Sequence, residues 1–430
     1  MILYNGKVYP TAEQNQLLGT LEEDINRTRE MFTLDSETVI NAADRLGKMI
    51  ADGAFDGLAA EFLKETDGEY LSLAAEFLKG DNLRFRLKKE LGKNFGKPRS
   101  FNPPYGIKET EVRTVPLGTL FHIAAGNMDA LPAFSVMEGL LTGNVNILKL
   151  PQADSGLTVE IFRRLIEIEP KLAPFVYIFD TPSSDMEAMK KMAEIADGII
   201  VWGGDEAVSA VRRLAPVGAK LIEWGHRLSF AYISGYSDKE RELSALAEHI
   251  IKTKQLLCSS CQTIFIDTER MSDVQDFCKE FLPYLERAAE KFSFDEIGAY
   301  AEMTLRRYTD RLEGHIGKKD RSRTYFNGRK CSITACTDSL CELSYMYGNV
   351  LVKPLTREKL LPELRRVKGY LQTAGLICRR NYRDELTDIL IRAGINRVTT
   401  AGNMSVTFCG ESHDGEYPLR RYVRVVNIEV

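Results

Sequence analysis

Cys258 is the leading candidate for covalent chemistry, because it lies among small polar residues just before an apolar, strand-like run at residues 263–266. A purely structural cysteine would prefer the apolar run itself, whereas a cysteine at the start of a strand is within reach of a substrate. Its thiolate needs a base or a dipole to form, and Glu223, in a separate stretch at residues 221–225, is a candidate base. The sequence therefore predicts nucleophilic thiol chemistry at Cys258.

The only C-x-x-C of the chain is formed by Cys258 and Cys261. A structural zinc site needs a second pair of ligands at suitable spacing, and none is evident near the five histidines. We expect no bound metal.

The composition indicates a globular protein with sizeable cores. The chain has 430 residues, 44 % of them hydrophobic, which suits two or three compact parts. The apolar runs are of strand length and the N-terminus lacks the pattern of a secretory signal. Eight scattered cysteines are too few for a disulfide framework, and a net charge of −4 with interspersed signs provides no basic patch. We expect a cytoplasmic protein with no membrane span and no nucleic-acid partner.

Hydrophobic periodicity divides the chain into a helical part and an alternating part. Residues 11–95 show helical spacing, with a candidate N-cap at residues 35–38. From Val112 onward, short apolar runs alternate with helical segments, and the runs occupy residues 118–124, 145–150, 175–179 and 198–202. This order predicts a parallel sheet covered on both faces. Ligands of such sheets bind beyond the carboxyl ends of the strands.

Polar and glycine residues follow three of these runs. Asn127 comes after the first, where its amide could donate to an oxyanion or cap the next helix, residues 133–141. Lys149 ends the second run and is either a ligand for a nucleotide or a solvated lysine. Gly203 and Gly204 follow the fourth and open a helix that could face a pyrophosphate, although a Gly-Gly pair also marks plain turns.

The order of these pieces resembles the aldehyde dehydrogenase superfamily and, within it, the fatty acyl-CoA reductases of bacterial luminescence, from about residue 112 to the C-terminus. Residues 115–118 look like the start of that superfamily's first cofactor strand, and Gly203-Gly204 replaces its Gly-Ser pair. The matching segments are residues 126–127 and 143–151 for the asparagine and lysine-proline motifs, residues 222–227 for the Glu-x-Gly-Gly-Lys box, residues 258–262 for the reductases' Cys-x-Ser-Pro-Gln, and residues 413–419 for their ending. Glu223 precedes Cys258 by 35 positions, as such enzymes require.

Three departures from the superfamily pattern stand out. Residues 344–349 replace the motif whose glutamate holds the nicotinamide ribose, and Tyr345 stands at that place, with a core tyrosine as the alternative. Cys261 replaces the proline of the reductase motif, and His226-Arg227 replaces Gly-Lys beside Glu223.

The resemblance implies NADPH-dependent reduction of a long-chain fatty acyl-CoA or other acyl thioester to the aldehyde, through an acyl-cysteine on Cys258. Glu223 would transfer the proton, and Asn127 would stabilise the oxyanion together with the Cys258 backbone amide. The implied cofactor contacts are Lys149, Gln152, Gly203, Gly204 and Gly225. Many NAD-specific relatives carry a glutamate where this chain has neutral Gln152, so this site favours NADPH, with NADH as the alternative.

Two other interpretations stay open. The same fold could oxidise aldehydes with water or coenzyme A as acceptor, or the chain could be a degenerate homologue that binds a nucleotide or a partner without turnover. Intact Asn127, Glu223 and Cys258 argue against the second of these.

The predicted fold is α/β and aldehyde dehydrogenase-like. A helical N-terminal region and a Rossmann-type nucleotide domain span residues 1–228 and are joined again by residues 395–430, and a second α/β catalytic domain spans residues 229–394. Residues 422–430 alternate like an exposed strand, which a partner usually covers, so we expect a homodimer or homotetramer. The resemblance also implies an acyl-protein donor, such as an acyl-activating synthetase.

Overall fold

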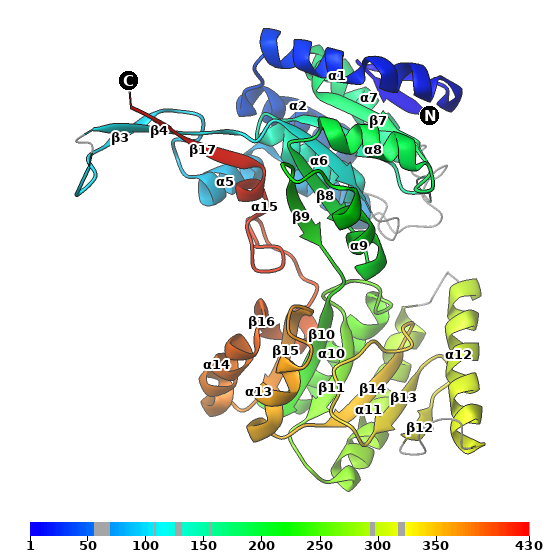
Figure 1. Cartoon of the computed structure of the whole chain (residues 1–430). Helices are drawn as coiled ribbons and strands as arrows, with labels where there is room; N and C mark the ends of the chain where they lie inside the picture. Colours follow the sequence, from blue (N-terminus) through cyan, green and yellow to red (C-terminus); the bar gives the residue numbers. More distant parts are fainter. Residues whose placement is uncertain are drawn as a thin grey trace. The chain divides into compact units, whose positions relative to one another are not determined.

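The computed structural model describes residues 1–55, 69–106, 109–124, 131–152, 154, 156–292, 297–316 and 323–429. The chain divides into two compact units, Met1–Gly225 with Phe408–Val430, and His226–Thr407 (Figure 1). The sequence-based boundaries were residues 228 and 395. Residues 395–407 belong to the second unit, because strand β16 (Arg397–Thr400) pairs there with β15 (Leu371–Cys378).

A seven-stranded sheet forms the centre of the first unit, in the order β2-β1-β7-β6-β5-β8-β9. Its five strands from β7 to β9 are parallel, whereas β1 runs antiparallel to β7 and to β2. The four runs expected to be strands are strands, and the sheet has three more that periodicity did not indicate, β9 and the two strands of the N-terminal hairpin. The bounds are β1 Ile2–Tyr4, β2 Lys7–Tyr9, β5 Thr119–Ile123, β6 Val145–Lys149, β7 Val176–Phe179, β8 Gly198–Trp202 and β9 Lys220–Trp224.

Helices cover both faces of this sheet. Helix α2 packs against α6 and α7, and α1 packs against α8. The Asp35 carboxylate caps α2 by accepting from the Thr38 amide at 2.9 Å, as the sequence predicted. The bounds are η1 Thr11–Glu13, α1 Gln14–Met31, α2 Ser36–Ala51, α4 Glu69–Leu78, α5 Gly80–Leu91, α6 Leu131–Leu141, α7 Leu157–Ile168, η2 Pro170–Phe175, α8 Met186–Ile195 and α9 Asp205–Leu214.

The connections of the first sheet diverge between β5 and β8. Strand β5 continues through α6 to β6 on one side, and β8 continues through α9 to β9 on the other. In open α/β sheets this switch point is where ligands bind, beyond the carboxyl ends of the strands. The carboxyl ends of β5 and β8 therefore mark the expected cofactor crevice.

A smaller sheet in the same unit has the strand order β17-β4-β3. Strand β17 pairs antiparallel with β4, so that the end of the chain lies beside residues more than 300 positions earlier. The bounds are β3 Arg99–Phe101, β4 Thr110–Pro116, α15 Pro418–Arg421 and β17 Val423–Ile428.

The second unit contains another seven-stranded sheet, in the order β12-β13-β14-β11-β10-β15-β16. All its strands are parallel except β12. The remaining bounds are β10 Leu228–Ser234, α10 Lys239–Lys252, β11 Cys261–Ile266, α11 Met271–Lys291, α12 Ile297–His315, β12 Arg323–Asn327, β13 Ser332–Cys336, β14 Asn349–Pro354, α13 Arg357–Arg365, η3 Arg380–Tyr382, α14 Arg383–Ala393 and η4 Ala401–Asn403.

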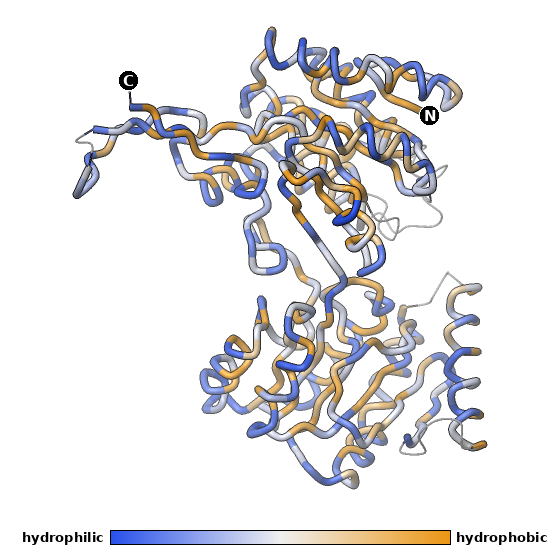
Figure 2. The backbone as a smooth tube through the Cα atoms, in the orientation of Figure 1, coloured by the Kyte–Doolittle hydropathy of each residue, from blue (hydrophilic) through white to orange (hydrophobic). Residues whose placement is uncertain are grey.

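Each unit has its own hydrophobic core. A large apolar cluster fills the first unit, and a smaller one surrounds Trp224 and Tyr422. In the second unit, one cluster lies beneath α10 and α11 and another beneath α13 and α14, on the two faces of the sheet. The strands of each sheet carry many of the hydrophobic stretches in Figure 2. Two such layered sheets confirm the α/β class.

Candidate active site

Cys258 lies on a tight turn immediately before β11, with its side chain exposed. The turn is closed by a bond from the Ser260 amide to the Leu257 carbonyl at 2.9 Å. The Ser260 hydroxyl in turn accepts from the Leu257 amide at 3.1 Å. An exposed thiol on a turn with defined backbone bonds is the presentation that a nucleophile requires.

Ser229 ties this turn to the sheet. Its hydroxyl donates to the Cys258 carbonyl at 2.6 Å and accepts from the Thr373 amide at 3.1 Å. Ser229 is near the start of β10 and Thr373 near the start of β15. The backbone of Cys258 is thus fixed to the amino ends of two neighbouring strands. Sequence spacing could not reveal that Ser229 is its partner.

Cys261 does not form a second reactive thiol beside Cys258. Its side chain is fully buried in the core of the second unit, and its Sγ donates to the Thr263 carbonyl at 3.5 Å. Burial raises the pKa of this thiol far above its ordinary value. The C-x-x-C pattern therefore separates an exposed sulfur from a structural one.

Lys149 ends β6 at the carboxyl edge of the first sheet. Its side chain is only 3 % exposed, which rules out a solvated lysine, and its Nζ donates to the Ser183 hydroxyl at 2.9 Å. Burial lowers the pKa of Lys149, opposed by the nearby Asp180. Gln152 follows in an exposed turn. A cation held at this edge suits an anionic ligand.

Gly203 and Gly204 connect β8 to α9. The Gly203 amide donates to the Trp224 carbonyl at 3.2 Å, and a Cβ on Gly203 would lie 2.9 Å from that of Ala207. The first turn of α9 carries Asp205 and Glu206, whose carboxylates complement the helix dipole. These two charges oppose a pyrophosphate at this helix terminus, a feature that the glycine pair alone did not indicate.

Glu223 is held by Arg212 in a two-pronged ion pair. Arg212 Nε and Nη2 donate to the two carboxylate oxygens at 2.6 and 2.7 Å. The hydrogen bond from Arg212 lowers the pKa of Glu223 below its ordinary value, against the effect of partial burial. Glu223 is therefore a stable carboxylate near the end of β9, and Gly225 follows as the last residue of this part of the unit.

An aromatic cluster adjoins these residues and was missed by sequence reasoning. The rings of Trp202 and Trp224 lie 5.4 Å apart, and the His413 imidazole lies 5.0 and 4.9 Å from them. Both tryptophans end strands, β8 and β9, at the switch-point edge. The available signal was the His413 segment, which resembles the reductases' ending.

The predicted residues fall into two groups. Lys149, Gly203, Gly204, Glu223 and Gly225 collect at the carboxyl edge of the first sheet, while Cys258 belongs to the second unit. Asn127 lies outside the described residues, and its role remains a prediction.

Among the described residues, no group of three or more His, Cys, Asp or Glu side chains could hold a metal ion. None of the described helices is both long and apolar enough to cross a bilayer.

A family model identifies the family to which this chain belongs. The model of the family "Acyl-CoA reductase (LuxC)" matches residues 32–425. The chain belongs to this family. It is 24 % identical to the long-chain acyl-protein thioester reductase 2 of Photobacterium leiognathi over 75 % of this chain and 66 % of that protein. The reductase of Aliivibrio fischeri is also 24 % identical, over 74 % of this chain. The match spans 65 % of that relative, so the chain covers just under two thirds of each relative's length.

Solved structures confirm the aldehyde dehydrogenase-like fold. Aldehyde dehydrogenase 21 from Physcomitrella patens superposes with a TM-score of 0.72 at 11 % identity, covering 96 % of this chain and 90 % of that one. Betaine aldehyde dehydrogenase from Staphylococcus aureus gives 0.70 at 14 % identity, covering 97 % and 87 %. At such identities the likeness establishes the fold alone.

Proposed function

We propose that this acyl-CoA reductase family member reduces a long-chain fatty acyl thioester to the aldehyde with NADPH. The single observation that carries the proposal is the exposed Cys258 thiol on its fixed turn, at the position where the sequence matches the reductases' cysteine motif. The relatives' names, long-chain acyl-protein thioester reductase, support an acyl thioester as substrate and an acyl-protein donor beside acyl-CoA.

The chain's residues divide the chemistry into two stages. The Cys258 thiolate attacks the thioester carbonyl, a new C–S bond forms, and the donor's thiolate leaves. Asn127 and the Cys258 amide are the proposed donors to the tetrahedral oxyanion. Adding one hydride and one proton to the acyl-cysteine then yields the aldehyde and restores the Cys258 thiol, with Glu223 as the proposed proton carrier.

A bound reduced nicotinamide supplies the hydride. The buried Lys149 ammonium with the neutral Gln152 beside it fits the adenosine end of NADPH, and we propose Gly225 as a further contact. Asp205 and Glu206 do not fit a pyrophosphate at the α9 terminus, so Gly203 and Gly204 contribute space rather than charge stabilisation.

The test is anaerobic incubation of the purified protein with tetradecanoyl-CoA and NADPH, followed by aldehyde analysis and intact-mass detection of an acyl adduct. Cys258→Ala should lose both adduct and aldehyde. Cys409→Ala is the matched control, because Cys409 is the other exposed cysteine of the eight, all of which are described. Turnover that survives in Cys258→Ala would overthrow the assignment. Aldehyde consumption with NADP⁺ but no reduction of the thioester would favour the oxidative alternative.

A further inference from the structure

Two pairs of residues with a left-handed backbone conformation are hydrogen-bonded to each other next to the Cys258 turn. Lys254 and Gln255 have φ values of 51° and 60°, and Met346 and Tyr347 have 58° and 48°. These are four of the six non-glycine residues with positive φ in the described part of the chain. Such conformations are strained and persist only where the surroundings impose them. Strain is thus concentrated at one place in the second unit.

The two strained pairs are bonded to one another. The Tyr347 amide donates to the Lys254 carbonyl at 2.9 Å, and the Gly348 amide donates to the Gln255 side-chain oxygen at 3.1 Å. The Gln255 side-chain amide donates to the Cys261 carbonyl at 2.9 Å. The backbone on both sides of Cys258 therefore depends on residues 347–348.

Tyr347 and Gly348 belong to residues 337–348, the connection between β13 and β14. It runs from the end of β13 to the start of β14, and because these strands are parallel the connection must travel back along the sheet. Along the way the Glu342 carbonyl accepts from the Thr263 hydroxyl at 3.0 Å. The Ser344 hydroxyl and amide both donate to the Gln262 side-chain oxygen, at 2.8 and 3.2 Å. We call residues 337–348 the return loop.

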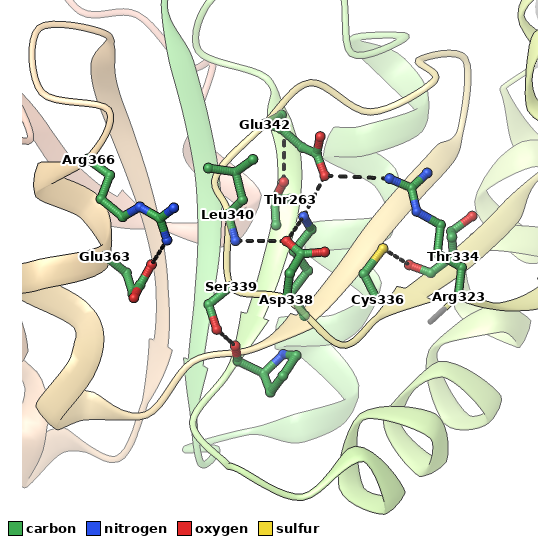
Figure 3. Close-up of polar contacts among 12 residues, drawn as sticks. Thr263, Arg323, Thr334, Cys336, Asp338, Ser339, Leu340, Glu342, Glu363 and Arg366 are labelled. Atoms are coloured by element: carbon green, nitrogen blue, oxygen red, sulfur yellow. Dashed lines mark hydrogen bonds and ion pairs between the residues drawn. The ribbon is translucent and has the colours of Figure 1, made fainter. Parts of the chain in front are cut away.

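The buried Lys353 ammonium forms ion pairs with two carboxylates of the return loop. Lys353 on β14 is 0 % exposed, and its Nζ lies 2.5 Å from Asp338 Oδ1 and 2.5 Å from Glu342 Oε1. Figure 3 shows both carboxylates turned toward the same point under the loop, with Arg323 approaching Glu342 from the other side. A buried ammonium is costly unless it is paired, so Lys353 holds both carboxylates in place.

We propose that Lys353 is a positioning residue for the nucleophile, acting through the return loop on the strained turn that presents Cys258. It touches no reacting atom. Its part in the reaction rests on the proposed function, whereas its hold on the turn does not. No residue of the Cys258 motif itself indicates this dependence, because Lys353 is 95 positions downstream.

The test compares Lys353→Met with Arg357→Met. Arg357 is a matched control because its guanidinium also bridges two carboxylates of the second unit, Asp267 at 3.4 Å and Glu385 at 3.2 Å. These two carboxylates lie outside the return loop. Hydrogen exchange followed by mass spectrometry should show faster exchange of residues 254–262 in Lys353→Met and not in Arg357→Met. This measurement requires no substrate.

The second readout is acyl transfer from tetradecanoyl-CoA to Cys258 in a single turnover. Lys353→Met should lower the rate constant roughly tenfold to a hundredfold, with the half-saturating concentration within about twofold, because small displacements of a reacting group slow chemistry more than binding. Iodoacetamide should still label only the exposed Cys258 and Cys409. Labelling of the buried cysteines would instead show that Lys353→Met is unfolded. The test then uses Glu342→Gln, which keeps Lys353 and Asp338 paired and should show the same changes to a smaller degree.

Unchanged exchange at residues 254–262 in a folded variant overturns the proposal, as does an equal response in Arg357→Met. If exchange quickens but the unaltered protein forms no acyl adduct, the proposed function fails while the structural role of Lys353 stands. If the adduct forms at the normal rate in the variant, Lys353 has no part in positioning.

Discussion

The Glu223 carboxylate is ionised and engaged, which limits what it can do as a base. A carboxylate whose pKa is lowered by a bidentate arginine accepts a proton less readily than an ordinary glutamate. Each Glu223 oxygen keeps a further lone pair beside its bond to Arg212, so a proton can still be accepted, but less readily while the pair is intact. Spacing along the sequence located the glutamate, but not its partner, because Arg212 lies on α9 and reaches it only after β8 and β9 pair.

Replacing Arg212 by glutamine should raise the pKa of Glu223, since the charged donor that stabilises the carboxylate is lost. If Glu223 must be ionised to accept the Cys258 proton, the acidic limb of the pH–rate profile moves to higher pH. The profile of acyl transfer in single turnovers measures this shift. Arg213→Gln, one position along the same helix, is the control and should leave the limb in place. An unmoved limb in Arg212→Gln would remove Glu223 from the proton path.

The proposed preference for NADPH depends on two single residues, Lys149 and Gln152. Lys149→Met removes a buried cation from the carboxyl edge of the first sheet, and losing one charge-assisted contact should weaken NADPH binding roughly tenfold. Gln152→Glu should weaken NADPH more than NADH, because a carboxylate repels a 2′-phosphate. Titration of intrinsic fluorescence with each nucleotide measures both effects. Equal losses for NADPH and NADH would place the phosphate elsewhere.

At the scale of elements, a buried charge cluster joins α5 to the returning C-terminal segment. Arg86 contacts Glu138 at 2.5 Å and Glu90 at 3.4 Å. Glu90 Oε2 accepts from the Leu419 amide at 2.9 Å, at the start of α15. Periodicity identified α5 as a helix, but could not show that its buried face carries charge, because the partners come from residues far along the chain. Burial is the main cause that raises the pKa of Glu90 to about 7.

Glu90→Gln should therefore change how stability depends on pH. The unfolded carboxyl ionises near 4.3, about as in model peptides. In the folded protein Glu90 keeps its proton up to about pH 7. Stability is lost as pH rises through this window, and the glutamine variant escapes the loss. We expect its melting temperature to exceed that of the unaltered protein by a few degrees at pH 8 and to match it at pH 4.

Thermal melts from pH 4 to 8 provide the measurement for Glu90→Gln. Glu37→Gln is the control, because Glu37 on α2 forms an exposed ion pair at 2.9 Å with Arg84, which lies on α5 as Glu90 does. Its melting temperature should follow that of the unaltered protein at each pH. A Glu90→Gln difference that is the same at all pH values would mean that Glu90 stays ionised when buried.

At the scale of the whole molecule, alternating hydrophobic runs were enough to predict the central parallel strands of the first sheet. The second α/β unit was expected from the resemblance to the aldehyde dehydrogenase superfamily. The N-terminal hairpin and the β17-β4-β3 sheet were not predicted, except that β17 was expected to be an exposed strand. Strand β1 pairs with β7 and β17 with β4, and such partners, distant in sequence, leave no local pattern. The carboxyl-edge residues were predictable because parallel strands bring their ends to one edge. The return loop was not, since its hydrogen bonds follow from side-chain packing alone.

Strand β17 leaves one of its edges without a strand partner in the described chain, since it pairs only with β4 there. Val425 in its middle is 64 % exposed. Such an edge invites pairing with another copy, and we predict a homodimer or homotetramer built through it. Removing residues 423–430 should reduce the mass measured by light scattering to that of a smaller assembly, while Val425→Lys, which keeps the strand but charges its face, should weaken the assembly less and make it concentration-dependent. An unchanged mass after truncation would place the subunit contact on another surface.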